Sequence, residues 1–161
     1  MMHTVMQMID LKGDLSAGGI KAQVDMLAER ELIPADLAEE IDCEAVATFF
    51  DLPLGKRMRA SKDIRRELPF GILIPAKEYY PDAGEDETIF VQGVVDALFM
   101  TDTGWTLLDY KTDRGADAET LKHRYRVQID LYRRAVEQLT GVPVTSSYLY
   151  ALATKRVVPM N

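Results

Sequence analysis

The spacing of hydrophobic positions changes near Arg66, from a helical repeat to runs typical of strands. Before this point, apolar residues recur every three or four positions, which predicts amphipathic helices. After it, the apolar runs are rich in β-branched and aromatic residues and are bounded by turn formers. The predicted helices of the first third cover residues 1–11, 17–30, 42–50 and 53–60.

The remaining chain predicts three strands, one long helix and a fourth strand. The first three strands are expected at residues 67–74, 89–100 and 105–112. The acidic stretch 81–87 has the composition of an exposed loop. Residues 118–140 have helical spacing and stop at Gly141, a residue that favours the left-handed cap of a helix. A strand over 146–153 follows, so we expect a right-handed parallel crossover attached to an antiparallel meander.

Length and composition predict a single compact domain. The 161 residues are 47% hydrophobic, enough for a full core. The expected organisation is a helical part at 1–62, followed by the sheet and crossover helix at 63–161. The class is α/β, with a mixed sheet of four to five strands flanked by helices.

Cysteine content and the apolar runs predict a cytoplasmic protein. A single Cys43 excludes an internal disulfide framework, a four-cysteine zinc site and a cysteine-ligated iron–sulfur cluster, and it fits a reducing compartment. The N-terminus resembles an amphipathic helix and not a signal peptide. No apolar run is long enough to span a membrane.

The net charge of -7 counts against a free-standing DNA-binding protein. Affinity for nucleic acid comes largely from Lys and Arg that neutralise phosphates. The objection weakens if a larger assembly supplies the basic DNA track, or if bound cations cancel part of the charge.

Two carboxylates are predicted to face each other across a hairpin. Residues 101–104 have the composition of a four-residue turn, so Met100 faces Trp105. In that register Asp96 lies opposite Asp109, with their β-carbons roughly 5 Å apart on one face. The carboxylates repel each other, and a divalent cation such as Mg²⁺ would compensate, because it prefers hard oxygen ligands.

Lys111 is predicted to join this face, because strand side chains alternate. Its ammonium can hold a phosphate or tune an attacking water, while a metal ion lowers the pKa of that water. The alternative is an ordinary ion-pair cluster of the two aspartates with Lys111 or Arg114. The apolar neighbours favour a functional site, because burying carboxylates without a charge partner is costly.

Other polar residues are candidates for the same site. Gln128 and Tyr132 lie four apart on the predicted helix and face the sheet, either toward the carboxylates and DNA or toward strand backbone. Their stripe is defined by Leu121, Tyr125, Ala135 and Leu139. His3 on the first helix is either structural or a metal ligand. Glu67 is either a further acid or an ion-pair partner of Arg65 or Arg66.

Taken together, these residues resemble the RecB-type nuclease domain of the PD-(D/E)XK superfamily, and more narrowly the nuclease domains of AddAB-type or RexAB-type bacterial helicase/nucleases. The resemblance covers almost the whole chain. The matching stretches are His-Thr-Val-Met-Gln at 3–7, Arg-Glu-Leu-Pro-Phe at 66–70, Val-Gln-Gly-Val-Val-Asp at 91–96, Leu-Asp-Tyr-Lys-Thr-Asp at 108–113 and Tyr-Arg-Val-Gln-Ile-Asp-Leu-Tyr at 125–132.

The resemblance implies a restriction-endonuclease-like core and a role for each matching residue. His3, Asp96, Asp109 and the Tyr110 carbonyl are implied as ligands of Mg²⁺, with Mn²⁺ as a substitute. Lys111 is implied as the catalytic lysine. Gln128 and Tyr132 are implied to support the site and contact DNA, and Glu67 matches a further family position.

The resemblance also implies DNA end resection during double-strand break repair, on single-stranded DNA. The implied partners are helicase domains of the same full-length chain and a second helicase/nuclease protein. The sequence lacks the Gly-x-x-x-x-Gly-Lys-Ser/Thr phosphate loop, so this chain is not itself the motor. The alternatives are a stand-alone RecB-family nuclease, or a catalytically inactive nuclease fold that binds DNA or acts as a scaffold.

Overall fold

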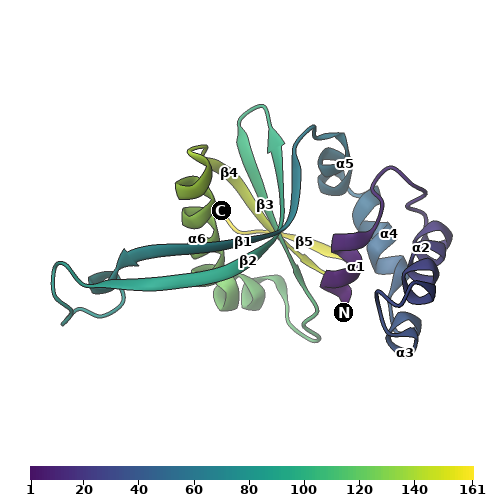
Figure 1. The fold of residues 1–161 in the computed structure, drawn as a ribbon, viewed down its shortest axis with the longest axis horizontal. Coiled ribbons are helices and arrows are strands. Elements are labelled where there is room, and N and C mark those ends of the chain that lie inside the picture. Colours follow the sequence, from purple (N-terminus) through teal and green to yellow (C-terminus); the bar gives the residue numbers. More distant parts are fainter.

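A five-stranded mixed sheet lies between helices on its two faces in the computed structural model, which describes residues 1–161 (Figure 1). The strands stand side by side in chain order. The strands are β1 (Ile64–Pro75), β2 (Thr88–Thr101), β3 (Gly104–Lys111), β4 (Val144–Ala151) and β5 (Arg156–Pro159). The helices are α1 (Met2–Met8), α2 (Ala17–Glu29), α3 (Ala35–Glu39), α4 (Cys43–Asp51), α5 (Pro53–Ala60) and α6 (Ala118–Thr140), with a 3-10 turn η1 (Ala76–Glu78).

The topology confirms that the predicted crossover is parallel. β1, β2 and β3 pair antiparallel as a meander, and β4 pairs parallel with β3 after α6. The Asp117 side chain caps the start of α6 by accepting from the Thr120 amide, and Gly141 ends it with a φ of 70°. These are the capping residues that a long helix between two parallel strands requires.

Three short elements, α3, η1 and β5, were not located from the sequence, and one strand was misplaced. The five-residue α3 and the four-residue β5 are too short to show a clear period. The fourth strand ends at Ala151 and not at Ala153, because the chain turns there into β5 through Lys155, whose φ is 54°.

Each face of the sheet has its own core. On one face, the N-terminal helices pack on Ala97, Phe99 and Leu108. On the other face, α6 packs on residues such as Val95 and Leu107. The Tyr150 hydroxyl donates to the Ala45 carbonyl at 2.7 Å and so ties the sheet to α4. The sheet is therefore held from both sides.

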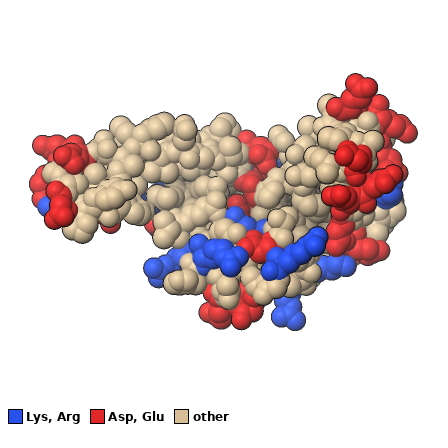
Figure 2. Space-filling model, turned by 90° about the horizontal axis from the view of Figure 1, so that it is seen from below, with Lys and Arg blue, Asp and Glu red and all other residues tan.

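Strands β1 and β2 continue beyond the body of the protein as a two-stranded arm (Figure 1). The predicted acidic loop at 81–87 lies at its tip, after η1. Asp and Glu side chains gather at this tip and over the opposite end of the molecule, with a broken row of Lys and Arg between them (Figure 2). None of the helices has the length and apolar character needed to cross a membrane.

Candidate active site

The candidate site lies where the β2–β3 ladder stops. The predicted register is confirmed from Met100 and Trp105 to Ala97 and Leu108. The next pair would be Asp96 and Asp109, but the ladder does not continue to it. Instead, the Asp96 side chain accepts a hydrogen bond from the Tyr110 amide at 2.8 Å. A carboxylate thus replaces a backbone acceptor at this end of the hairpin.

The neighbouring strand β1 is distorted at the same level. Arg66 pairs with Ala97 and Leu68 with Val95, but Glu67 is left out of the ladder and has a φ of 53°. For a residue other than glycine, this left-handed conformation costs of order 1–3 kcal/mol. Backbone strain is therefore concentrated beside Asp96.

The side-chain alternation of β2 breaks at this level as well. Val95 and Leu98 both pack in the α6 core, although three positions separate them, whereas Ala97 packs in the helical core. A regular strand would place Val95 and Leu98 on opposite faces. Asp96 thus lies where β2 turns between the two cores.

Asp109 is a buried carboxylate with an incomplete set of partners. Its side chain is 3% exposed, and burial, followed by the charge of Asp96, raises its pKa to about 6 despite the opposing effect of Lys111. The Lys111 ammonium forms an ion pair with Asp109 Oδ2 at 2.6 Å, and no other group donates to this oxygen. Of the ion pairs that the alternative interpretation expected, the one between Asp109 and Lys111 is present, whereas Arg114 forms no ion pair.

Residues of α6 hold the Lys111 side chain from the other side. The ammonium donates to Gln128 Oε1 at 2.8 Å, and Gln128 Nε2 donates to the Tyr132 hydroxyl at 3.0 Å. The ammonium also lies 3.9 Å from the centre of the Tyr125 ring, a cation–π contact. The structure thus brings Gln128 and Tyr132 to Lys111 and not to strand backbone, the other alternative that the sequence left open, and it adds Tyr125.

The predicted buried stripe of α6 was wrong at its end. Leu139 is 53% exposed, and Ala135 and Val136 form the last buried turn. Thr140 contacts the sheet in place of Leu139, because its hydroxyl accepts a hydrogen bond from Trp105 Nε1 at 3.1 Å.

His3 reaches the same group of oxygens from α1. Its Nε2 lies 2.9 Å from the Tyr110 carbonyl oxygen and 3.3 Å from Asp96 Oδ2. A carbonyl oxygen only accepts, so Nε2 carries a proton that it donates. The hydrogen bond to Asp96 raises the pKa of His3 above its ordinary value. The proton on His3 Nε2 therefore lies between that nitrogen, the Tyr110 carbonyl oxygen and Asp96 Oδ2, three atoms that could each bind a metal ion.

Glu67 also belongs to this neighbourhood. Burial, and next the charge of Asp96, raises its pKa, while His3 lowers it. The alternative of an ion pair with Arg65 or Arg66 was wrong. Arg65 pairs with Asp63, and Arg66 is engaged by backbone carbonyls of α1. Glu67 thus adds a third carboxylate to those of Asp96 and Asp109.

Sequence reasoning missed the role of Arg66. Its guanidinium donates to the Met6 carbonyl at 3.1 Å and to the Ile9 carbonyl at 2.7 Å. These carbonyls lie at the end of α1, where backbone acceptors lack helical partners and attract a cation. Arg66 therefore fixes the helix that carries His3, a contact between distant segments that leaves no pattern in the sequence.

The residues present fit a divalent cation that prefers oxygen. Asp96, Asp109 and the Tyr110 carbonyl supply oxygen atoms, and His3 supplies a nitrogen. Asp109 Oδ2 has only the Lys111 ammonium as a partner while the charge of Asp96 lies close by, and this favours a further positive charge here. No three His, Cys, Asp or Glu side chains cluster closely enough to hold a metal by themselves. A bound Mg²⁺ would therefore rely on the carbonyl, water or substrate phosphate.

Comparison with known proteins identifies the family. Residues 1–159 match the model of the PD-(D/E)XK nuclease superfamily. The A subunit of the ATP-dependent helicase/nuclease of Thermoanaerobacter sp. (strain X514) is 42% identical over 154 residues, covering 92% of this chain and 12% of that relative. The protein of the same name from Desulforudis audaxviator (strain MP104C) is 46% identical over 158 residues, covering 95% and 13%. The chain thus spans only a small part of these relatives.

Proposed function

This chain belongs to the PD-(D/E)XK nuclease superfamily, and from that premise we propose that it hydrolyses phosphodiester bonds of single-stranded DNA with Mg²⁺, or Mn²⁺ in its place. The single observation that carries the proposal is the buried Asp109, whose Oδ2 has the Lys111 ammonium as its only partner and whose pKa is raised to about 6 by burial and by the charge of Asp96. This arrangement is unfavourable for stability by itself, because buried charges are costly unless fully paired. A bound cation would remove that cost.

The proposed metal ligands are His3, Asp96, Asp109 and the Tyr110 carbonyl. When bound, the ion supplies Lewis acidity and lowers the pKa of a water molecule. Nε2 of His3 would then have to lose the proton that it now donates to the Tyr110 carbonyl and Asp96. That proton would go to solvent from a protonated ring, or to Nδ1 in a neutral one.

Lys111 acts on the reacting phosphate in this proposal. Its ammonium has three protons, of which Gln128 accepts one and Asp109 lies near another. The third can be donated to a phosphate oxygen or an attacking water. Gln128, supported by Tyr132, and the ring of Tyr125 fix the ammonium in place, so that little reorganisation precedes the reaction.

We propose that residues 1–161 act as one nuclease domain of a larger cytoplasmic helicase/nuclease. The relatives are named as A subunits of ATP-dependent helicase/nucleases, and they are far longer than this chain. The rest of such a chain would supply the motor, and a second subunit would complete the assembly. The role in this assembly is resection of DNA ends during double-strand break repair.

The test is cleavage of end-labelled single-stranded DNA by the purified chain in Mg²⁺, with EDTA as the metal-free control. Asp109→Ala removes the proposed ligand, and Asp102→Ala removes an exposed aspartate at the turn between the same two strands. We expect cutting by the wild type and Asp102→Ala, and none by Asp109→Ala or in EDTA. DNA binding without cutting in Mg²⁺ or Mn²⁺ would instead identify an inactive DNA-binding module. A multimeric mass in solution would favour the stand-alone nuclease.

A further inference from the structure

Asp113 lies in the loop between β3 and α6, two residues after Lys111. Its side chain is 15% exposed. The Tyr125 hydroxyl donates to this carboxylate and lies 2.8 Å from Oδ2 and 3.1 Å from Oδ1. The Arg124 guanidinium forms an ion pair with the same carboxylate. A partly buried aspartate therefore holds the hydroxyl end of Tyr125.

The ring of the same tyrosine contacts the proposed catalytic lysine. The Lys111 ammonium lies 3.9 Å from the centre of the Tyr125 ring. A hydroxyl that donates to a carboxylate makes its ring more electron-rich, which strengthens the attraction of the ring for a cation. The hydrogen bond to Asp113 therefore orients the ring and favours its contact with Lys111.

The charge of Asp113 makes this hydrogen bond a strong one. Burial raises the pKa of Asp113, but the hydrogen bonds from Tyr125 and Arg124 and the charge of Arg124 lower it by more, so it stays below its ordinary value. Asp113 is thus ionised at neutral pH. Hydrogen bonds to an ionised acceptor are shorter and stronger than those between neutral groups.

Arg124, the other partner of Asp113, is less suited to hold the site. Its side chain is 50% exposed. An ion pair with an exposed partner contributes little, because water and salt screen it. Loss of Arg124 should therefore leave Asp113 and Tyr125 in place.

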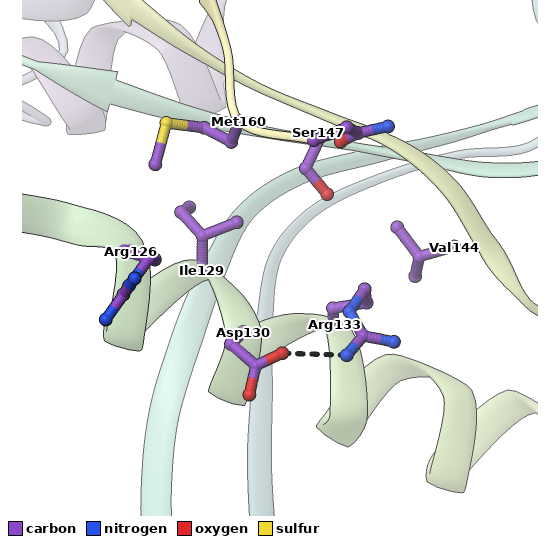
Figure 3. A pocket seen from close by; sticks show the side chains of 8 residues that line it. Arg126, Ile129, Asp130, Arg133, Val144, Ser147 and Met160 are labelled. Carbon is purple, nitrogen blue, oxygen red and sulfur yellow. Dashed lines mark hydrogen bonds and ion pairs between the residues drawn. The ribbon is translucent and has the colours of Figure 1, made fainter. Parts of the chain in front are cut away.

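A second pair of aspartate and arginine on α6 offers a matched comparison. Asp130 accepts a hydrogen bond from Arg133 at 2.7 Å, as Figure 3 shows. Both residues line a pocket of about 310 Å³ between α6 and β4, to which Lys111 and Tyr125 do not contribute. Asp130 thus forms the same kind of ion pair as Asp113 but is not connected to the site.

We infer that Asp113 is a positioning residue for the proposed reaction and acts through Tyr125 to hold the Lys111 ammonium in place. The inference rests on the proposed nuclease function and adds a residue that touches neither DNA nor metal. A lysine has a flexible four-carbon stem, so its ammonium needs several contacts to stay in one position. Tyr125, fixed by Asp113, supplies one of these contacts, and Gln128 supplies another.

The test measures single-turnover cutting of end-labelled single-stranded DNA at saturating Mg²⁺ and DNA. Asp113→Ala removes the acceptor of the Tyr125 hydroxyl, and Asp130→Ala is the matched control. We expect Asp113→Ala to slow cutting about 10-fold, because a misplacement of about 1 Å can cost as much as about 100-fold. Its Kd values for DNA and Mg²⁺ should stay at those of the wild type. Asp130→Ala and Arg124→Ala should cut at the wild-type rate.

Double variants test whether Asp113 acts through the tyrosine and the lysine. Tyr125→Phe keeps the ring but loses the hydroxyl, so it should cut as slowly as Asp113→Ala. Asp113→Ala/Tyr125→Phe should cut no more slowly than Tyr125→Phe alone, and Asp113→Ala/Lys111→Met no more slowly than Lys111→Met alone. A structural role unrelated to Lys111 would slow each double variant by the same factor as Asp113→Ala slows the wild type, and this result would overturn the inference.

A further readout does not depend on cutting. Protons above the face of an aromatic ring are shifted upfield in NMR spectra, so the ε-methylene signal of Lys111 should be shifted in the wild type. Its loss in Lys111→Met identifies the signal. We expect the shift to shrink in Asp113→Ala and to persist in Asp130→Ala.

The outcomes separate this inference from the proposed function. An unchanged upfield shift or an unchanged cutting rate in Asp113→Ala would overturn the inference. If the wild type still cut DNA in a Mg²⁺-dependent manner, the nuclease function would stand. A wild-type chain that did not cut DNA in Mg²⁺ or Mn²⁺ would remove both.

Discussion

At its turn, the β2–β3 hairpin is held by close packing, whereas its other end carries two carboxylates and a lysine. Trp105 is buried at the turn end, where its indole donates to Thr140 and the Arg65 guanidinium lies 4.8 Å from its ring centre. Gly104 has a φ of 138°, and a Cβ there would lie 2.5 Å from the Pro143 carbonyl oxygen. Each of these features stabilises the turn.

The opposite end of the hairpin lacks such stabilising features. The ladder stops, Glu67 adopts a strained conformation, and Asp109 is buried without a full set of partners. Local features that conflict with stability tend to occur at functional sites. Within one hairpin, the turn end therefore stabilises the fold, and the opposite end carries the residues of the candidate site. Substitutions at either end test this difference.

The largest effect is expected from Lys111→Met, which should slow DNA cutting by about 10³-fold, because one preorganised group that stabilises developing charge is lost. Lys62→Met, an exposed lysine near the turn end, is the control and should cut at the wild-type rate. Single-turnover assays at saturating Mg²⁺ measure both. A Lys111→Met chain that retained more than a tenth of the rate would exclude the proposed role.

Trp105→Ala should affect the other end alone. Loss of this buried side chain should lower the free energy of unfolding by about 3–5 kcal/mol, as measured by urea denaturation. Titration calorimetry under folded conditions should give a Mg²⁺ Kd within about twofold of the wild-type value. A large loss of Mg²⁺ affinity would show that the two ends are not independent.

Arg66→Ala should loosen α1 and so misplace His3. Loss of a residue that supports a metal ligand costs about 10–100-fold in affinity, and we expect about 10-fold for Mg²⁺ by calorimetry. If Arg66 had a structural role unrelated to His3, the double variant His3→Ala/Arg66→Ala should bind Mg²⁺ more weakly than His3→Ala alone. If Arg66 acts through His3, His3→Ala/Arg66→Ala should bind Mg²⁺ no more weakly than His3→Ala alone.

A further effect is a pH dependence of metal-free stability. The pKa of Asp109 is raised from 3.8 to about 6 in the folded protein, so folding favours its protonated form. The resulting stabilisation is fully present below about pH 4 and is lost as the pH rises through 6. Melting curves in EDTA from pH 4 to 8 should therefore show a decline for the wild type that is weaker in Asp109→Asn. Parallel profiles would contradict the raised pKa.

The sequence predicted most of this arrangement because hairpin register and helix period follow from local pattern. The turn at 101–104 sets the register as far as Ala97 and Leu108, one residue short of the predicted Asp96–Asp109 pair, which the ladder does not form. The spacing of Gln128 and Tyr132 puts both on the face toward the sheet. The positive φ of Glu67 was not predictable, because its neighbours are those of an ordinary strand. The contact of Arg66 with the end of α1 depends on tertiary packing, which the sequence pattern does not encode.

The central claim is that the site end of the hairpin is unfavourable for stability until a metal ion binds. Thermal melting of the wild type and Asp109→Asn at pH 7.5, each in EDTA and in Mg²⁺, tests it most directly. In EDTA, Asp109→Asn should melt a few degrees higher than the wild type, since 1 kcal/mol shifts Tm by about 2–4 °C at this size. Mg²⁺ should raise the Tm of the wild type and leave the variant unchanged. A variant that melts lower in EDTA, or a wild type that ignores Mg²⁺, would contradict the account.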